Sequence, residues 1–217
     1  MKSKFKRDQI PADQAKNWKK SLEEELTFNL KIPHLFMRKE TYLKLAGEND
    51  NRVRIYLGIE PQKKEGKYVL CAYAVSAFLL GSGDVFRDYE NPVFKLDKEN
   101  QDQSSHTEEV LQNIKRYRDW RMGKLDAGDE GARFRKYIYP NAYLMSKYEL
   151  HEILISQDKK EARVTFGISK TMNAMVYQKQ DKDTSLDIET EVFDFSAPCP
   201  PNCDESSIFN SFENDGG

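Results

Sequence analysis

The residues from which metal and redox sites are built are scarce in this sequence. It contains only 3 His and 3 Cys in 217 residues. A structural zinc site needs four ligands, normally supplied as two paired clusters. Cys199 and Cys203 form one such pair, whereas the third cysteine and the histidines are isolated along the chain. We therefore predict a protein that carries no cofactor.

The signature motifs of the common enzyme classes are also missing. The chain has no G-x-S-x-G, no H-E-x-x-H, no P-loop and no G-x-G-x-x-G, so the sequence identifies no nucleophile or nucleotide-binding loop. The glycines of Gly81–Asp84 indicate a turn, because no helical pattern follows them. These absences favour a protein that is not an enzyme. A catalytic pair formed by residues distant in sequence stays open.

Long apolar runs are missing too. The longest, Tyr68–Leu80, is too short to span a membrane as a helix. The basic N-terminal stretch lacks the apolar region of a signal peptide. With so few cysteines, we expect a cytoplasmic protein without a membrane partner. The mean hydropathy is -0.79, but 11 Tyr, 12 Phe and 2 Trp supply enough apolar area for a core.

Negative charge is concentrated near the C-terminal end. From Asp181 onward the chain has ten acidic residues and Lys182 as its one basic residue, which leaves 33 basic and 26 acidic residues in the remainder. A basic body with an acidic tail suits a protein that binds a polyanion, or one whose tail covers its own body. The same charges also keep a protein soluble, so they do not decide between these interpretations.

Two segments of the chain, residues 32–59 and 139–168, follow the same pattern. Each has a proline, an aromatic-apolar pair, a short helical stretch, a polar turn and a strand. The strands read VRIYLGI and ARVTFGI, and they share an arginine at Arg54 and Arg163. An amphipathic helix precedes each copy and a second strand follows it. The pattern indicates an internal duplication.

The segments that close the two halves also correspond. Val85–Phe94 and Val192–Pro200 both contain Val-Phe, an aspartate, an aromatic residue and a proline, and the aspartates are Asp88 and Asp194. Because the first segment has no cysteine, the shared part of this pattern is best explained as architecture.

These patterns predict an α+β protein. We expect two tandem, related helix–short helix–strand–strand units with antiparallel sheet, at residues 1–104 and 105–217, packed as one pseudo-symmetric body. The alternating strands predict one apolar face covered by helices and one polar face in solvent. Gly58 and Gly167 are expected to mark a bulge or a strand end.

The helix of the second unit has clear signals. Val110, Ile114 and Tyr117 fall on one face at helical spacing. Ser105 and Glu108 have the spacing of a capping box, so the helix is expected to begin near Ser105.

The stretch around Cys199 and Cys203 is rich in proline. Pro200 and Pro201 favour an extended or turning backbone over the helix start on which redox dithiols usually lie. The residues favour a rigid loop with two half-buried thiols. A disulfide and a zinc site stay open as alternatives.

The chain resembles a group of small uncharacterised Bacteroidetes proteins, flavobacterial ones especially. The most specific part of the resemblance is the FDFxxPCPPxCD pattern at Phe193–Asp204. The resemblance implies a bacterial origin. It transfers no activity and no catalytic residue.

The stretch 113–139 is both basic and aromatic. Arginine together with aromatic side chains suits phosphates and stacked bases. The candidate nucleic-acid contacts are Arg116, Arg118, Arg121, Arg133 and Arg135.

Three functions are compatible with the sequence. We favour a non-enzymatic binding or assembly module that presents Arg54 and Arg163 to a protein partner or to a second copy. The alternatives are a nucleic-acid-binding protein and a small hydrolase or transferase with a site between the two halves.

Overall fold

The structure is a computed structural model that describes residues 6–25, 29–48, 51–81, 84–125, 135, 138–178, 191–194 and 196–210. It has the predicted α+β class, with two sheets and four α-helices in the described residues. The helices are α1 (Ala12–Glu25), α2 (Lys39–Ala46), α3 (Thr107–Arg121) and α5 (Lys147–His151), with a 3-10 turn η1 (Ser104–His106) and a π-helical turn η2 (Glu152–Ser156).

The first sheet is antiparallel throughout. In spatial order its strands are β1 (Gln9–Ile10), β10 (Val192–Phe193), β9 (Met172–Tyr177), β8 (Glu161–Ile168) and β3 (Leu35–Arg38).

The second sheet contains one parallel pair. Its strands are β11 (Ala197–Cys199), β7 (Ala142–Leu144), β4 (Arg52–Ile59) and β5 (Tyr68–Leu79), with β2 (Leu30–Lys31) and β6 (Phe86–Lys95) both paired to β5. Only β2 runs parallel to its neighbour. The antiparallel pairing predicted for the last two strands of each half is confirmed in β4–β5 and β8–β9.

Each sheet takes strands from both halves of the chain. Strand β3, from before residue 104, pairs with β8, and β7, from after residue 105, pairs with β4. The helices follow the same exchange, since α1 packs on β8 and α3 packs on β4. Neither half therefore completes a sheet alone. The duplication and the boundary near residue 104 stay predictions.

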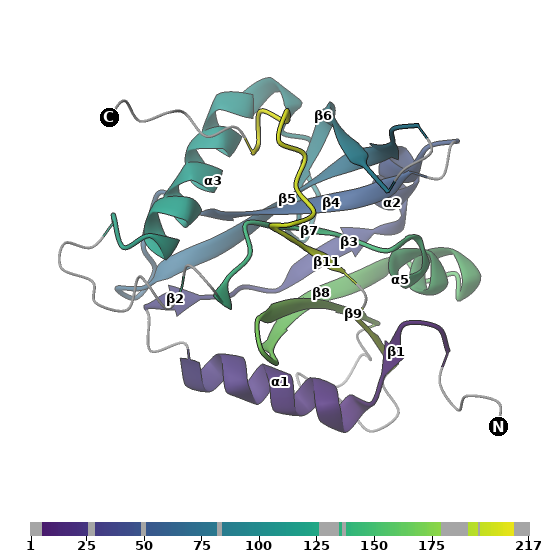
Figure 1. The fold of residues 1–217 in the computed structure, drawn as a ribbon, viewed down its shortest axis with the longest axis horizontal. Coiled ribbons are helices and arrows are strands. Elements are labelled where there is room, and N and C mark those ends of the chain that lie inside the picture. Colours follow the sequence, from purple (N-terminus) through teal and green to yellow (C-terminus); the bar gives the residue numbers. More distant parts are fainter. Residues whose placement is uncertain are drawn as a thin grey trace.

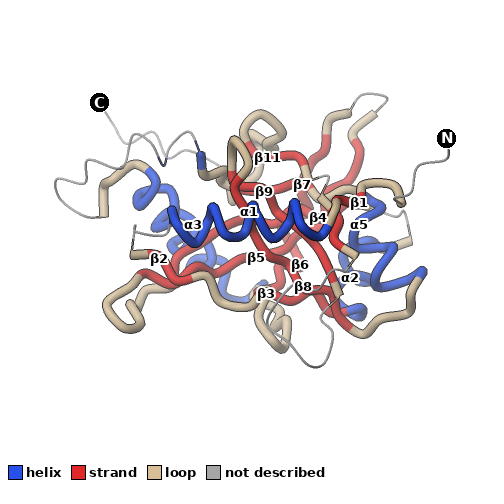
Figure 2. The backbone as a smooth tube through the Cα atoms, turned by 90° about the horizontal axis from the view of Figure 1, so that it is seen from below, coloured by secondary structure: helices blue, strands red, loops and turns tan. Residues whose placement is uncertain are grey.

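The two sheets pack against each other and carry a helix on each outer face, with α3 and α1 on opposite sides of the molecule (Figures 1 and 2). The core between the sheets contains Ile55 and Leu57 of β4 together with Val164 and Phe166 of β8. Smaller apolar clusters lie beneath α3 and α1. Both faces of the central strands are thus covered.

The prediction of one solvated sheet face is wrong. Arg54 and Tyr56 lie on the outer face of β4 with 1% and 0% of their surface exposed, and Arg163 of β8 has 5% exposed. Alternation showed correctly which residues share a face. It did not show that a second layer covers the polar face.

Gly58 and Gly167 let the two helices approach their strands. No bulge occurs at either glycine, and each is the next-to-last residue of its strand. A Cβ at Gly167 would lie 2.7 Å from Cβ of Trp18 in α1, and one at Gly58 would lie 3.2 Å from the backbone of Asn113 in α3. The absence of a side chain is therefore what the packing requires.

The apolar face of α3 is confirmed, because Val110, Ile114 and Tyr117 are all buried. Its predicted start is wrong. The helix begins at Thr107 after the 3-10 turn, and no side chain caps it.

Replacing Gly167 with alanine should destabilise the protein. The added methyl would press on α1 at Trp18, and overpacking of this kind costs about 1–3 kcal/mol. Urea unfolding measures the loss. Lys170→Ala, at the exposed turn after β8, is the control and should leave the midpoint unchanged. An equally stable Gly167→Ala protein would show that the helix is not held this closely.

Candidate functional site

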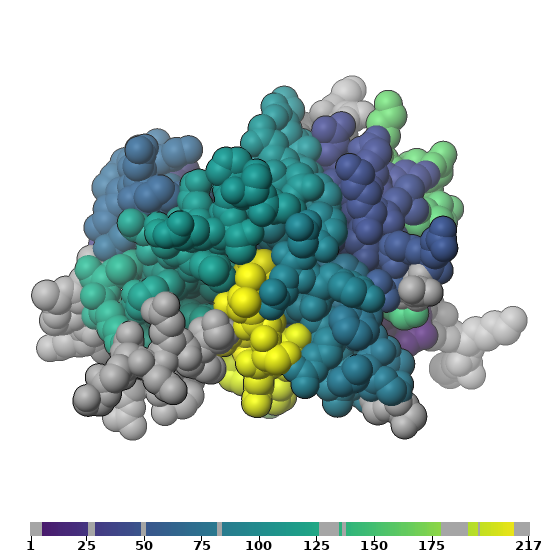
Figure 3. Space-filling model, turned by 90° about the horizontal axis from the view of Figure 1, so that it is seen from above, coloured from purple at the N-terminus to yellow at the C-terminus, as the bar shows by residue number. Residues whose placement is uncertain are grey.

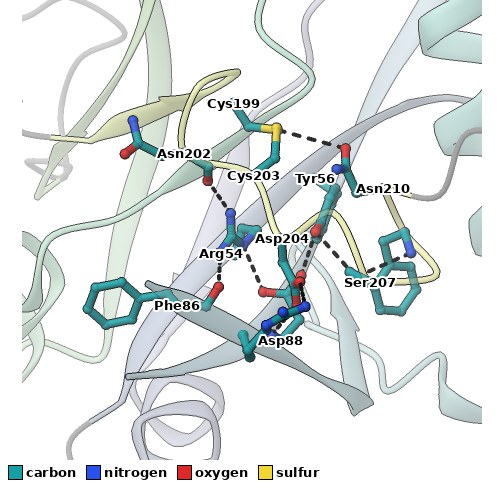
Figure 4. Close-up of polar contacts among 12 residues, drawn as sticks. Arg54, Tyr56, Phe86, Asp88, Cys199, Asn202, Cys203, Asp204, Ser207 and Asn210 are labelled. Carbon is teal, nitrogen blue, oxygen red and sulfur yellow. Dashed lines mark hydrogen bonds and ion pairs between the residues drawn. A yellow bond between two sulfur atoms is a disulfide. The ribbon is translucent and has the colours of Figure 1, made fainter. Parts of the chain in front are cut away.

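A buried ionic cluster lies on the outer face of β4 (Figure 4). The Nε of Arg54 donates to Oδ1 of Asp88 on β6 at 2.7 Å, and both side chains are almost fully buried. Another guanidinium nitrogen donates to the Phe86 carbonyl oxygen at 3.0 Å. The Tyr56 hydroxyl donates to the second oxygen of Asp88. These partners come from two strands, β4 and β6, which lie on opposite sides of β5.

The C-terminal segment, residues 197–210, covers this cluster. It lies on the surface between α3 and the β5–β6 region, and it is the yellow segment in Figure 3. The carbonyl oxygen of Asn202 accepts a hydrogen bond from Arg54. Asp204 accepts from the backbone N–H of Asp88 at 2.8 Å and from Arg87 at 2.9 Å. The ring of Phe209 packs on Tyr56.

Burial is the main influence on the charges of the cluster. It raises the pKa of Asp88, and the Arg54 charge and the hydrogen bonds from Tyr56 and Arg54 oppose that effect. It also raises the pKa of Tyr56 well above the usual value for a phenol. Burial likewise acts to raise the pKa of Asp204, but its hydrogen bonds outweigh this and lower it.

Cys199 and Cys203 are joined in a disulfide. The favoured prediction of two thiols is therefore wrong, and the structure has the disulfide alternative. The Cα atoms lie only 4.8 Å apart because the proline-rich turn between them folds back on itself. Cys199 is fully buried beneath α3. Since disulfides persist mainly in oxidising compartments, the bond weighs against the cytoplasmic setting, which stays a prediction.

The cluster fastens the C-terminal segment to the sheet. Asp88, Tyr56 and Asp204 have the chemistry of acid–base groups. Their oxygens are already engaged by one another and by Arg54 and Arg87. Arg54 is therefore not presented to a partner, contrary to the prediction.

The basic stretch is mostly engaged within the protein. Arg118 donates to the Phe209 carbonyl oxygen, and Arg121 donates to Oδ1 of Asn141. Arg135 is 2% exposed. It donates twice to the Trp120 carbonyl oxygen, and its guanidinium lies over the Trp120 ring. Burial lowers the pKa of both Arg118 and Arg121.

The remaining two candidates of this stretch differ. Arg116 is partly exposed and lies 3.5 Å from the Pro61 carbonyl oxygen. Arg133 lies outside the described residues. The structure therefore does not bring the five arginines together on one exposed surface.

A cavity of about 470 Å³ lies between α1 and β8. Its wall includes Arg163 and Thr165 on the outer face of β8 and Tyr177 on β9. The apolar part of its lining comes from Leu22, Leu30, Ile32, Pro33, Val164 and Phe166, and the other polar and charged part from Lys19, Glu23, Lys31, His34, Glu65 and Lys67. The lining therefore combines an apolar surface with an excess of basic groups.

Arg163 is the buried charge of this cavity. Its guanidinium carbon lies 5.9 Å from the ring centroids of both Phe36 and Tyr177, which flank it on neighbouring strands. Among the described residues, no carboxylate forms an ion pair with it. Burial raises the pKa of Tyr177, and the charge and hydrogen bond of Arg163 oppose this. The polar side chain beside Arg163 is therefore the neutral phenol of Tyr177.

Sequence reasoning missed the partners of both arginines. Asp88 was recognised as part of a repeated pattern, but its pairing with Arg54 depends on strands β4 and β6 lying on opposite sides of β5. Tyr177 carried no local signal beyond its place in a strand. The matching positions of Arg54 and Arg163 were the one usable indication of a site.

Two acids meet at the end of the first sheet. The N–H of Asp194 donates to the Asp8 carbonyl oxygen at 2.9 Å, beside the pairing of β1 with β10. Burial, and to a lesser degree the charge of Asp8, raise the pKa of Asp194 to about 6.

Comparison with known proteins gives no relative. No family model, no curated protein and no solved structure matches the chain. Within the described ranges, no helix has the length and apolar character needed to cross a membrane. The same residues contain no group of three or more His, Cys, Asp or Glu side chains placed to hold a metal ion.

Replacing Asp88 with asparagine should strongly destabilise the protein, because Arg54 would be left buried without a counter-charge. Breaking one partner of a buried pair costs about 3–5 kcal/mol. Urea unfolding measures the loss. Asp158→Asn, which removes the exposed partner of Lys39, is the matched control and should change the midpoint little. Equal effects of the two substitutions would contradict the assigned role of the cluster.

Asp194→Asn should change how stability depends on pH. Because the pKa of Asp194 is raised in the folded state, folding binds a proton between about pH 4 and pH 6, and stability falls as the pH rises through that window. The asparagine variant lacks this loss. Its advantage over the wild type should grow across the window to about 1–2 kcal/mol after allowance for solvent screening. Thermal unfolding from pH 3.5 to 8 tests this, and parallel curves would contradict it.

Proposed function

We propose that this protein is a non-enzymatic binding module whose recognition site is the cavity between α1 and β8. Its partner supplies an acidic group to Arg163. The single observation that carries the proposal is a guanidinium with 5% of its residue surface exposed, lining a cavity, without an ion pair to a described carboxylate.

The energetics of a buried charge support this site. Removing an ion from water costs several kcal/mol unless a partner compensates for the lost hydration. Phe36 and Tyr177 compensate in part through their rings, but cation–π contacts contribute only ~1–2 kcal/mol each. An incoming anion would supply the missing counter-charge in surroundings where hydrogen bonds to ions are strong.

The rim of the cavity adds long-range attraction. Lys19, Lys31 and Lys67 outnumber the acids Glu23 and Glu65 in the lining. Lys31 and Glu65 pair at 3.1 Å, but both are well exposed, so the pair contributes little stability and can open. The basic excess would steer an anion toward the buried guanidinium.

The other functions have less support. Four of the five arginines of the basic stretch are described, and each contacts the protein's own backbone or amide groups, which leaves them poorly placed for phosphates. The acid–base groups of the Arg54 cluster are engaged with one another. A binding role requires only the cavity and the buried charge of Arg163 that lines it.

Binding of small anions tests the proposal. Benzoate, 3-phenylpropionate, phenyl phosphate and benzenesulfonate can be screened by saturation-transfer NMR against the wild type and Arg163→Gln. At least one should bind the wild type and lose binding in the variant. Arg38→Gln, an exposed arginine on β3 outside the cavity lining, is the control and should bind as the wild type does. Failure of all four anions to bind the wild type would overturn the function.

A further inference from the structure

Arg54 and Arg163 occupy corresponding places in two similar strands. Each is the third residue of an eight-residue strand, and in each strand the seventh residue is a glycine covered by a helix. Each arginine points to the outer face of its sheet, beneath the layer that includes α3 or α1. The two sites therefore show the same side chain in two similar settings.

Around Arg54 the protein supplies its own ligands. A carboxylate from Asp88 accepts from Nε at 2.7 Å, and the Phe86 and Asn202 carbonyl oxygens accept from the terminal nitrogens. The group that balances the charge is a single carboxylate, and the remaining acceptors are neutral. This arrangement is closed by the C-terminal segment (Figure 4).

Around Arg163 the corresponding carboxylate lies elsewhere. Asp194 is the sequence counterpart of Asp88, but its backbone bonds to Asp8, and Asp8 is the charge that most affects it. The neighbours of Arg163 across the strands are the rings of Phe36 and Tyr177. A cavity takes the place of the covering segment.

We propose that the cavity binds a small organic monocarboxylate with an apolar body, and that Arg163 holds its carboxylate as Arg54 holds Asp88. This inference rests on the proposed binding function and names its ligand class. The carboxylate matches the planar fork of one guanidinium. A phosphate dianion would bring a second negative charge, whereas Arg163 is the buried cation of the lining and Lys31 and Lys67 are exposed to solvent.

The rest of the lining suits the apolar body. Leu22 and Leu30 give a buried apolar surface, and the cavity of about 470 Å³ falls within the range that holds small ligands. The hydroxyls of Thr165 and Tyr177 are the polar side-chain groups on the strands beside Arg163. They can add hydrogen bonds to the same carboxylate.

Matched ligands test the ligand class. We would titrate the full chain with 3-phenylpropionate, 3-phenylpropionamide and phenyl phosphate, using ¹⁵N NMR to locate and quantify binding. The carboxylate should bind and shift the amides of Thr165 and Tyr177. The neutral amide should bind roughly tenfold to a hundredfold more weakly, as expected for loss of a charge-assisted hydrogen-bond pair. Phenyl phosphate should bind more weakly than the carboxylate.

Two variants locate the effect. Arg163→Gln should weaken carboxylate binding to the level of the amide, and Arg38→Gln should leave it unchanged. If Arg163→Gln does not fold, the positions of the amides that shift in the wild-type protein locate the bound carboxylate instead. Tighter binding of phenyl phosphate at the same amides would overturn this inference and leave the binding function standing. Failure of every ligand to bind would overturn both, and carboxylate binding that shifts amides away from the cavity would overturn the site.

Discussion

The close packing of a helix on a glycine sets the outer layers of this structure. Trp18 of α1 lies against Gly167, and Asn113 of α3 lies against Gly58, at distances that leave no room for a side chain. Each helix thereby covers the outer face of a strand that belongs to the opposite half of the chain. The polar side chains on that face, which would otherwise meet water, become buried. This packing places Arg54 and Arg163 within covered faces, and the C-terminal segment completes the cover over Arg54.

The protein balances its two buried arginines in different ways. Arg54 has a carboxylate, two carbonyl oxygens and a covering segment closed by a disulfide. Arg163 has two aromatic rings, a phenol and a cavity. The first arrangement balances the charge of Arg54 within the chain, and we therefore assign it a role in stabilising the fold. The second leaves the charge without a described counter-ion, and this difference is why we assign recognition to the second site.

Local sequence signals predicted local structure well where one interaction dominated. The face of α3 that contains Val110 and Ile114 is buried. The segments around Arg54 and Arg163 form the strands that the sequence predicts. The sequence signal for where a helix begins was less reliable. A capping box predicted at Ser105 is absent, whereas one forms at Ser146 and Glu149 at the start of α5. The spacing is the same in both places, but Ser105 lies inside the 3-10 turn η1, whereas Ser146 has the extended backbone of an N-cap.

The sequence by itself determined which residues share a face, which segments form helices and strands, and that two arginines hold matching positions. These properties depend on contacts between residues close along the chain, and their periods are fixed by backbone geometry. Only the tertiary structure decided that β3 and β7 exchange between halves, that Asp88 reaches Arg54, and that Arg163 lines a cavity. Those outcomes depend on packing between residues that are far apart in the sequence. Local patterns in the sequence carry no information about such contacts.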